Sequence, residues 1–471
     1  MEKKNWMVTT AIPYVNGNPH LGHALDYLLA DALSRYHKIL GDEVRFLTGT
    51  DEHGGKIYKK SLDSGKSVQD FVDEKASVFQ QFIADLGVEY TSNIRTSSKE
   101  HKDLCQKIWQ KLEDHIYKNR YEGWYCEGCE GFITQKEYDD NGGICPDHQK
   151  PYEKLAEDNY YLRISDFKDQ LKTEIENDRL LILPNKRKKE FLNLLADMPD
   201  VSISRPKDKV VWGIPVPGDE EQVMYVWIDA LSNYLTQLGY PDKEIGGIWP
   251  PDVQIVGKDI LRFHAGIWPV MLFGLNLDLP KTLLTHGFIT VDGQKMSKSI
   301  GNVVDPYEVI SKHGHEAFRH YFLRHASTTE DADFSWDKYE ASYLELANVI
   351  GNLVQRLANL CMKNSINGRK KATDLDLDYM VMMNECNLSH AFDYAWEKAQ
   401  KINKRIDEEK PWALIKEDES AGKKLLAELA DGIMEVALHL KPFLPNTADR
   451  IESIFSAEEI VTPETPLFPK N

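Results

Sequence analysis

The chain has 471 residues, 42% of them hydrophobic and 28% charged, with a formal net charge of −18 at pH 7. This length is too great for one core, so we expect roughly two to four domains, and the composition excludes a disordered chain. No run of about 18 apolar residues is present, so no membrane span is expected. The six cysteines are too few for a disulfide framework and the N-terminus carries no cleavable signal, which predicts a protein of the reducing cytoplasm.

The acidic charge argues against a nucleic-acid partner, because phosphate binding needs a positive surface. From residue 346 onward there are 16 Lys and Arg against 20 Asp and Glu, so the C-terminal part does not reverse the balance. Any RNA contact must then use local basic patches. We expect one near Lys186-Arg187-Lys188-Lys189 and another along one face of the C-terminal helices, although such a basic run is more often a solvated helix face.

The first elements predict the start of a βαβ unit. Trp6–Ile12 is a short apolar run typical of a buried strand, Pro13–Pro19 is a turn-rich loop, and Leu21–Leu40 has apolar residues at helical spacing. His20 and His23 therefore lie at a helix N-terminus, where N–H groups and the helix dipole favour an anion. Both imidazoles can donate to a phosphate, although histidine pairs also occur as ordinary surface or core residues.

A second strand is predicted over Val44–Gly49, and Asp51 follows it closely. Ligands of open α/β sheets bind at the carboxyl ends of the strands, so Asp51 is placed to hold an amine. Helices are expected over about 67–86 and about 98–118.

The next segment carries a metal-ligand pattern. Cys126 and Cys129 are followed, after fifteen residues, by Cys145 and His148. Three thiolates and one imidazole suit tetrahedral Zn²⁺, and four protein ligands leave no open position for water. We interpret the segment as a structural zinc knuckle, with catalytic zinc as the less favoured alternative.

The α/β character returns near residue 225. Tyr225–Ala230 is strand-like and leads into Leu231–Leu238, Val253–Asp259 is a buried strand, and Leu283–Phe288 follows an apolar helix. A zinc-bearing domain is thus predicted to interrupt one sheet between about 120 and 225. Beyond 345, an antiparallel bundle is predicted from three helical patterns, which are Tyr343–Cys361, Leu377–Glu408 and Ala421–Leu440.

A basic loop, Lys295-Met296-Ser297-Lys298-Ser299, lies between two glycines. Glycines let a loop approach a ligand, and lysine ammonium groups neutralise phosphate. By itself such a loop is usually only a solvated loop. Its significance depends on the histidine motif far upstream.

The motif His20-Leu21-Gly22-His23 and the lysine loop together resemble the two signature motifs of class I aminoacyl-tRNA synthetases. The whole chain resembles the methionyl-tRNA synthetase family in its short bacterial-type form with one zinc knuckle. The other matching motifs are Ala11-Ile12-Pro13-Tyr14, Gly49-Thr50-Asp51-Glu52-His53-Gly54, Tyr225-Val226-Trp227-Ile228-Asp229-Ala230 and Gly257-Lys258-Asp259.

The resemblance implies an α/β fold, with a Rossmann-like parallel sheet split by a zinc-binding connective insertion and followed by an all-α C-terminal anticodon-binding bundle. The implied catalytic domain has two halves, at 1–115 and 225–290, separated by the connective insertion at 116–224. The lysine-loop and stem-contact region follows at 291–345, and the anticodon-binding domain at 346–471.

The implied reaction is ATP-dependent ligation of L-methionine to tRNA(Met), including the initiator tRNA, through methionyl-adenylate, with release of AMP and pyrophosphate. The implied cofactors are Mg²⁺ with ATP and one structural Zn²⁺, and we expect a monomer. Implied ATP-binding residues are His20, His23, Gly257, Asp259, Lys295 and Lys298. The histidines and lysines among them are the catalytic set, and Lys298 matches the lysine most closely tied to the activation transition state.

The implied methionine-binding residues are Ile12, Tyr14, Asp51, Trp227, Ala230, Tyr234 and His286, and the implied zinc ligands are Cys126, Cys129, Cys145 and His148. Asp51 can pair with the substrate ammonium, and Tyr14 and Trp227 offer an apolar, polarisable wall for a thioether. The implied anticodon readers are Asn352, Arg356 and Trp412. The first two share a helix face and can reach base edges, and Trp412 can stack on a base or belong to the bundle core.

Three alternatives stay open. A synthetase for a branched-chain amino acid would carry an editing domain, for which 120–225 is too small, and a cysteine enzyme would bring zinc ligands to its pocket. A non-catalytic tRNA-binding paralogue would be expected to lose one of the four catalytic residues. A small-molecule nucleotidyltransferase would not need the helical domain.

Overall fold

The computed structural model describes residues 4–126, 129, 131–147, 149–296 and 302–470. Its centre is a six-stranded parallel sheet. The strands in spatial order are β3 (Ser92–Arg95), β2 (Glu43–Thr50), β1 (Asn5–Thr10), β12 (Val253–Gly257), β13 (Thr282–His286) and β7 (Leu181–Leu183). The chain moves outward from β1 through β2 to β3 and, in the other direction, from β12 to β13, while the earlier strand β7 forms the far edge. Strand order therefore reverses between β1 and β12, the place where open α/β sheets form a ligand crevice.

Alternation along the strands gives the sheet two buried faces. Val8 and Ile255 pack on the side covered by α1 (Leu21–Leu40), in a core that continues into the helical domain. Met7 and Val256 point to the opposite side and pack in a second core. That second face is covered by α4 (Lys99–Lys111), α8 (Val226–Thr236), the π-helical turn Phe263–Ile267 and α9 (Trp268–Gly274). Residues two apart share a face in a strand, so this pattern is what a sheet buried on both sides requires.

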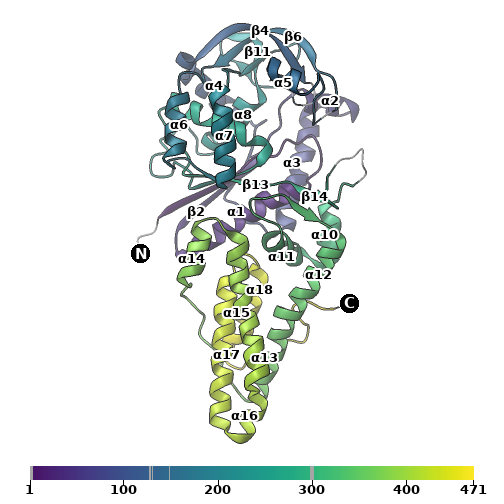
Figure 1. The fold of residues 1–471 in the computed structure, drawn as a ribbon, viewed down its shortest axis with the longest axis vertical. Coiled ribbons are helices and arrows are strands. Elements are labelled where there is room, and N and C mark those ends of the chain that lie inside the picture. The colour runs from purple at the N-terminus through teal and green to yellow at the C-terminus, as the bar shows by residue number, and fades with distance from the viewer. Residues whose placement is uncertain (1–3, 127–128, 130, 148, 297–301, 471) are drawn as a thin grey trace.

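Helix α1 has the predicted limits because both ends are capped. His20 is the N-cap, and Gly41, with φ of 89°, closes the C-terminus by donating its N–H to the carbonyls of the last turn. The left-handed conformation at Gly41 is one that glycine adopts without strain. The helix that begins at the histidine motif therefore runs without interruption under the sheet (Figure 1).

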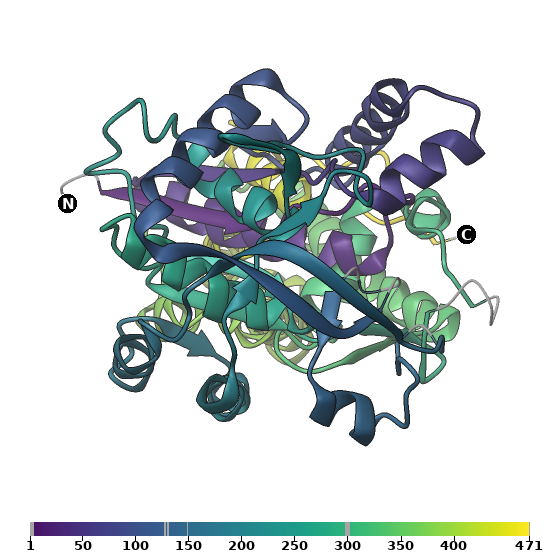
Figure 2. The same ribbon diagram turned by 90° about the horizontal axis from the view of Figure 1, so that it is seen from above.

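A long antiparallel ribbon stands above the sheet and belongs to the predicted insertion (Figures 1 and 2). Its sheet consists of β5 (Gly131–Ile133), β4 (Ile116–Cys126), β6 (Glu153–Leu162) and β8 (Val201–Ser202), with α5 (Gln135–Asp140) alongside. A second small sheet follows, formed by β10 (Pro215–Val216), β11 (Asp219–Met224) and β9 (Ser204–Pro206).

The structure differs from the predicted insertion at one point, because part of 116–224 completes the parallel sheet. β7 pairs with β13, and α7 (Asn185–Asp197) packs beside it, with α6 (Lys168–Glu176) next to α7. A three-residue strand is too short to be recognised by its periodicity. Two further predictions were wrong: Tyr225–Ala230 is not a strand, because α8 begins at Val226, and the helix expected over 98–118 ends at Lys111.

The C-terminal region is helical, as predicted, and extends away from the sheet as an elongated bundle (Figure 1). A three-stranded sheet of β15 (Gln294–Lys295), β14 (Ile289–Val291) and β16 (Ala332–Phe334) precedes it. The remaining helices are α2 (Gly55–Asp63), α3 (Val68–Asp85), α10 (Pro306–His313), α11 (His315–His320), α12 (Trp336–Leu346), α13 (Asn352–Lys363), α14 (Leu377–Asn384), α15 (Leu388–Glu409), α16 (Pro411–Glu417), α17 (Glu419–Leu440) and α18 (Pro445–Ser456).

A buried arginine joins the bundle to the part of the molecule that holds the parallel sheet. Arg319 is fully buried, pairs with Asp31 of α1 at 2.7 Å, and donates to the carbonyl of Phe443 at 2.6 Å. A buried guanidinium needs such partners on all sides, so the joint between α1 and the bundle is specified by geometry as well as by apolar packing. Within the described part of the chain, no helix combines the length and apolarity needed to cross a membrane.

Candidate active site

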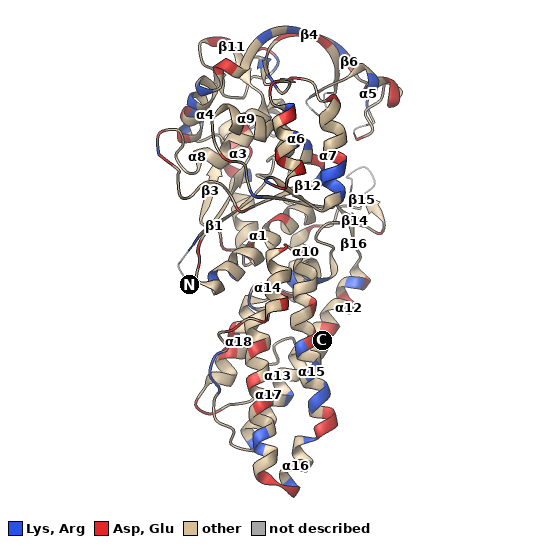
Figure 3. Cartoon of the chain, turned by 60° about the vertical axis from the view of Figure 1, so that its left-hand side comes forward, with Lys and Arg blue, Asp and Glu red and all other residues tan. Residues whose placement is uncertain are grey.

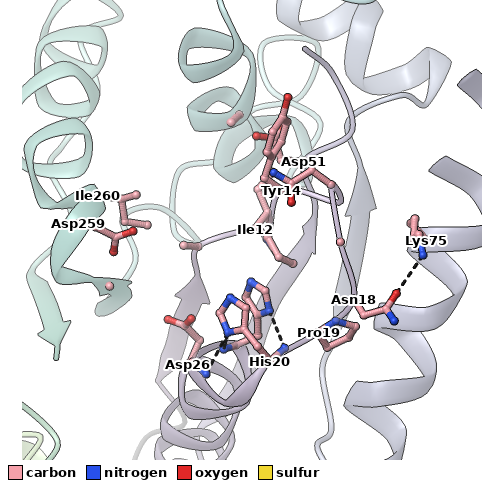
Figure 4. Close-up of a pocket in the computed structure, with 18 of the residues that line it drawn as sticks. Ile12, Tyr14, Asn18, Pro19, His20, Asp26, Asp51, Lys75, Asp259 and Ile260 are labelled. Carbon is pink, nitrogen blue, oxygen red and sulfur yellow. Dashed lines mark hydrogen bonds between the residues drawn. The ribbon is translucent and has the colours of Figure 1, made fainter. Parts of the chain in front are cut away.

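A cavity of about 1290 Å³ opens at the crevice between β1 and β12. It collects predicted side chains from two separate parts of the sequence, residues 12–51 and residues 227–286. The predicted site residues that line it are Ile12, Tyr14, His20, His23, Asp51, Trp227, Ala230, Tyr234, Gly257, Asp259 and His286 (Figure 4). The reversal of strand order thus brings the two halves of the predicted site into one space.

The histidine motif forms a reciprocal cap at the start of α1. Nδ1 of His20 accepts from the N–H of Gly22 at 3.1 Å and of His23 at 3.4 Å, and Nδ1 of His23 accepts from the N–H of His20 at 3.2 Å. The rings stack, with centroids 3.6 Å apart. A Cβ on Gly22 would lie 3.0 Å from the ring of His20, so glycine makes room for it.

This cap fixes where the protons of the two rings lie. A nitrogen that accepts from a backbone N–H carries no proton, so Nε2 is the protonated nitrogen of each neutral ring. Burial, with the neighbouring imidazoles of His20 and His286, holds the pKa of His23 well below its usual value. The cap therefore presents Nε2–H donors, which suits an anion at the helix N-terminus.

Asp51 is held at the opposite wall of the cavity by backbone pairing. Its N–H donates to the carbonyl of Pro13 at 2.9 Å, and its carbonyl accepts from Val15 at 3.0 Å. Tyr14 forms the bridge partner, so both side chains rise from adjacent strand ends (Figure 4). Asp51 is 7% exposed, and a carboxylate so buried attracts a cationic group strongly.

Helix α8 and the π-turn provide an aromatic wall. Trp227 stacks on Phe263 with centroids 3.7 Å apart and planes 10° from parallel. Beside them the hydroxyl of Tyr234 lies 2.8 Å from Nε2 of His264, and Nδ1 of His264 lies 3.1 Å from the carbonyl of Ile260. The carbonyl requires a proton on Nδ1, so Nε2 accepts a hydrogen bond from the Tyr234 hydroxyl.

His264 lines the cavity but was not predicted from the sequence. Burial lowers its pKa to about 4, so the ring is neutral at neutral pH. A single histidine in an apolar helix is usually a core residue, and no spacing rule distinguishes the two cases. The π-turn that aims its ring at Tyr234 is visible only in the structure.

His286 lines the cavity as predicted, with both ring nitrogens engaged. Nε2 lies 2.8 Å from Oδ1 of Asp26, and Nδ1 lies 2.8 Å from the carbonyl of Gly287. Burial alone would lower the pKa of His286, but the Asp26 carboxylate and the carbonyl outweigh burial and raise it. Two oxygen partners fit a doubly protonated ring, so the raised pKa favours a positive charge near the histidine cap.

A buried network fixes α8 behind the cavity. Asp229 accepts from His53 at 2.6 Å and from Nε2 of His101 at 2.7 Å, and Nδ1 of His101 lies 2.8 Å from the hydroxyl of Thr236. Burial would raise the pKa of Asp229, but the two histidines hold it at about 2. His53 follows Asp51 on the same loop, so this network ties the carboxylate wall to the aromatic wall. Asp229 belongs to the sequence motif Tyr225–Ala230, but nothing in the sequence predicts that it pairs with His53 and His101.

Two further predicted ATP residues, Gly257 and Asp259, line the cavity. A Cβ on Gly257 would come 2.7 Å from Oδ1 of Asp259, so glycine permits this close turn at the end of β12. Lys298 falls outside the described residues, and for Lys295 the structure describes its backbone in β15. Lys75, which the sequence did not single out, also lines the cavity and donates to Asn18 at 2.9 Å (Figure 4).

The thiols of the predicted knuckle come together. The sulfurs of Cys126, Cys129 and Cys145 lie within 4.8 Å of one another, and the N–H of Cys129 donates to Sγ of Cys126 at 3.3 Å. Burial and the two adjacent sulfurs raise the pKa of Cys129. Clustered thiolates are favourable only with a cation among them, so the set fits one Zn²⁺. His148 falls outside the described residues.

The predicted anticodon readers lie together at the far end of the bundle. Asn352 and Arg356 share a face of α13, Arg356 pairs with Asp407 at 2.6 Å, and its guanidinium lies 5.5 Å from the ring centre of Trp412. Trp412 is 41% exposed at the start of α16, so it does not belong to the bundle core. An aromatic ring with an adjacent guanidinium is a surface on which a base can stack.

Comparisons with known proteins agree with this geometry. The family model "tRNA synthetases class I (M)" matches residues 6–155 and 147–358. The methionine–tRNA ligase of Caldanaerobacter subterraneus subsp. tengcongensis is 37% identical and the match covers 98% of this chain and 76% of that protein. The methionine–tRNA ligase of Brucella melitensis biotype 1 is 35% identical, and the match covers 97% of this chain and 93% of that protein.

The fold agrees with a solved structure over its full length. Mycobacterium tuberculosis methionyl-tRNA synthetase in complex with methionyl-adenylate superposes with a TM-score of 0.90 at 30% identity, covering 99% of this chain and 100% of that one. The family model covers the parallel sheet and the insertion, and the matches to the relatives and to the solved structure extend through the bundle. The chain belongs to the methionyl-tRNA synthetase family of class I tRNA synthetases.

Proposed function

We propose that this protein is a methionine–tRNA ligase that activates L-methionine with ATP and transfers it to tRNA(Met). The single observation that carries the proposal is one cavity in which the Asp51 carboxylate, the Trp227 wall and the histidine cap face a common space. An ammonium, a thioether and a polyphosphate each have a partner there. Membership of the family supports the same reaction.

Methionine binds with its ammonium at Asp51 and its side chain along Trp227 and Ala230. The thioether ends near Tyr234, whose hydroxyl proton is committed to His264, so the base of the pocket offers a polarisable and uncharged surface. A branched side chain would fill this linear space poorly, and a polar one would lose hydrogen bonds made in water. The α-carboxylate then points toward the histidine cap.

Activation needs placement and charge stabilisation more than a protein nucleophile. A methionine carboxylate oxygen attacks the α-phosphorus of ATP, the bond from that phosphorus to the bridging oxygen breaks, and pyrophosphate leaves. The Nε2–H groups of His20 and His23 donate to phosphate oxygens, while Lys295 and Lys298 neutralise the charge on the leaving group. Gly257 and Asp259 hold the adenosine, and Mg²⁺ enters with ATP.

Transfer uses the second substrate, the tRNA. The 2′-hydroxyl of its terminal adenosine attacks the carbonyl carbon of methionyl-adenylate, which releases AMP and a proton. Asn352, Arg356 and Trp412 read the anticodon by hydrogen bonding and stacking. We propose that the initiator tRNA is among the substrates and that the protein acts as a monomer.

One Zn²⁺ would be held by Cys126, Cys129, Cys145 and His148. With four protein ligands it would have no open position, so it would supply no chemistry and would fix the fold of the knuckle. Cys129 also lines the main cavity, so the knuckle borders the substrates. The cytoplasmic location expected from the sequence stays a prediction.

Aminoacylation tests the proposal directly. Incubation of the protein with ATP, Mg²⁺, total tRNA and radiolabelled methionine is expected to give a base-labile ester on tRNA(Met) alone. Charging of the same tRNA pool with labelled valine, isoleucine, leucine or cysteine, in place of methionine, would contradict the proposal. Omission of ATP is the matched control and is expected to abolish the product.

A further inference from the structure

A second cluster of metal-ligand side chains lies at the joint between the catalytic side and the bundle. His320 ends α11, His325 ends the π-helical turn Tyr321–His325, and Glu345 lies in the last turn of α12. One ring nitrogen of each histidine and one carboxylate oxygen lie within 4.8 Å of one another. This cluster takes no part in the proposed synthetase reaction.

The π-turn is what brings the two histidines to the same side. In an α-helix, residues five apart differ by about 140° around the axis and face different directions. In a π-helix the hydrogen bond runs from residue i to i+5, as between the N–H of Ala326 and the carbonyl of Tyr321 at 3.2 Å, so residues five apart lie one above the other. π-turns occur preferentially at functional sites.

His320 has the arrangement of a metal-ligating histidine. It is fully buried, its Nδ1 lies 2.8 Å from Oγ of Ser342, and its Nε2 has no hydrogen-bond partner among the residues the structure describes. Metal-bound histidines typically use the second ring nitrogen in this way, to bond an oxygen that fixes the ring. A buried imidazole nitrogen left unpaired is unfavourable, so a ligand at this position would relieve it.

The other two side chains complete a set that is open to solvent. Nε2 of His325 lies 3.4 Å from Oε2 of Glu345, and two ligands on a tetrahedral ion with bonds of about 2.0–2.1 Å lie roughly 3.3 Å apart. Oε1 of Glu345 is held by Arg324 at 2.9 Å, which orients the carboxylate. His325 is 35% exposed, so an ion can enter and the side chain can rotate to close the remaining distance.

The cluster of His320, His325 and Glu345 differs from a second histidine-containing cluster in the chain. His101, Cys105 and Asp229 are also close enough to hold an ion. There, however, both nitrogens of His101 are engaged, with Asp229 and Thr236, so the cluster is complete without one. Among the histidines of these clusters in the part of the chain that the structure describes, only His320 has a buried ring nitrogen without a hydrogen-bond partner.

We propose that His320, His325 and Glu345 bind one divalent transition-metal ion such as Zn²⁺, Co²⁺ or Ni²⁺, with water completing its coordination. Two imidazoles and one carboxylate suit these ions and not Mg²⁺ or Ca²⁺, which prefer oxygen ligands. The ion ties the π-turn to α12, the helix that leads into the bundle. The site is separate from the cysteine knuckle, whose ligands are thiolates.

Calorimetric titration of the full-length protein, with its knuckle already loaded with Zn²⁺, tests the site. Co²⁺ is expected to bind at one further ion per chain, without the thiolate-to-metal charge-transfer band that Co²⁺ in the knuckle would show. Binding stabilises the folded state, so the unfolding temperature is expected to rise with Co²⁺ concentration. His325→Ala is expected to weaken binding by more than about tenfold and to remove the thermal shift.

The matched control is His390→Ala, which removes another exposed histidine, bonded to Asn387 at 2.6 Å, that is not a member of this cluster. It is expected to leave Co²⁺ binding unchanged. Because His325 is exposed, its substitution does not threaten the fold. Uptake of no ion beyond the knuckle zinc, or equal binding by wild type and His325→Ala, would overturn the proposal.

Discussion

At the scale of single residues, the base of the proposed methionine pocket depends on a histidine that stays uncharged. His264 is 3% exposed and its pKa is lowered to about 4 by burial, against an ordinary value of 6.5. Between these two values the unfolded chain binds a proton that the folded chain does not. Stability is therefore expected to fall as pH falls from 6.5 toward 4, by about 2 kcal/mol between pH 7 and pH 5 from this residue.

Histidine-labelled protein observed by NMR measures this pKa. The imidazole signal missing from His264→Asn identifies the residue, and we expect that signal to stay unchanged from pH 8 down to about pH 5. Titration near pH 6.5 would contradict the neutral, Tyr234-bonded ring. The exposed His390 serves as an internal control.

Site residues that stand in a short motif or match the family's pocket could be predicted from the sequence, and His264 could not. His20, His23, Asp51 and Trp227 stand in short motifs, and all four line the cavity. His264 has no neighbour in sequence that marks it, because its partners Tyr234 and Ile260 are set by a π-turn. The roles in binding and catalysis stay predictions until they are measured.

At the scale of elements, helix α8 is positioned by the carboxylate of Asp229. We predict that Asp229→Asn raises the KM for methionine and lowers kcat/KM about tenfold or more, with the KM for ATP little changed. The amide cannot accept from both His53 and His101, and a buried hydrogen bond to a charged group contributes about 1.5–3 kcal/mol. ATP–pyrophosphate exchange at varied methionine and varied ATP separates the two constants.

The control for this prediction is Asp242→Asn. Asp242 pairs with Lys107 of α4, so it links α4 to the segment after α8, but on the exposed surface. Exposed pairs contribute little, so methionine kinetics are expected to stay within about twofold of wild type. Equal effects of both substitutions would contradict the prediction, because they would show that the fall in kcat/KM for methionine does not depend on the buried hydrogen bonds of Asp229.

The elements that could not be assigned from the sequence are a helix that is buried on all sides and a very short strand. Helix α8 is buried nearly all round, from Ile228 to Thr236, so its apolar residues show no helical period, and Tyr225-Val226-Trp227-Ile228 has the composition of a strand. Helix α1 has clear caps and its limits were predicted correctly. Strand β7 is only three residues long and is defined by its pairing with β13.

At the scale of the whole molecule, an acidic chain must still hold an RNA. The basic run at the start of α7 is visible in Figure 3, but it is largely neutralised: Lys186 pairs with Glu330 at 3.0 Å and Lys188 with Asp178 at 2.6 Å. The positive charge expected there is thus weaker than the sequence suggests, because Lys186, Arg187 and Lys188 each pair with an acidic residue. We therefore expect tRNA recognition to depend more on stacking and base contacts, such as those proposed for Trp412, than on charge.

Trp412→Ala tests this division between the two ends of the molecule. ATP–pyrophosphate exchange is expected to stay unchanged, because the residue is far from the cavity along the bundle (Figure 1). Loss of base stacking corresponds to about 1–3 kcal/mol, so kcat/KM for tRNA(Met) is expected to fall roughly 5- to 150-fold. Tyr90→Ala, which removes an exposed aromatic residue near β3, is expected to leave both reactions unchanged. An equal fall in both reactions would contradict the assignment of Trp412 to the anticodon.

The most direct test of the central claim is ATP–pyrophosphate exchange with each of the twenty amino acids in the absence of tRNA. The cavity predicts exchange with methionine alone, since Asp51 selects the ammonium and the Trp227–Tyr234 wall selects the thioether. Exchange with another amino acid would contradict the assignment of this pocket. No exchange from folded, zinc-loaded protein would contradict the proposed activity and favour a tRNA-binding relative without catalysis.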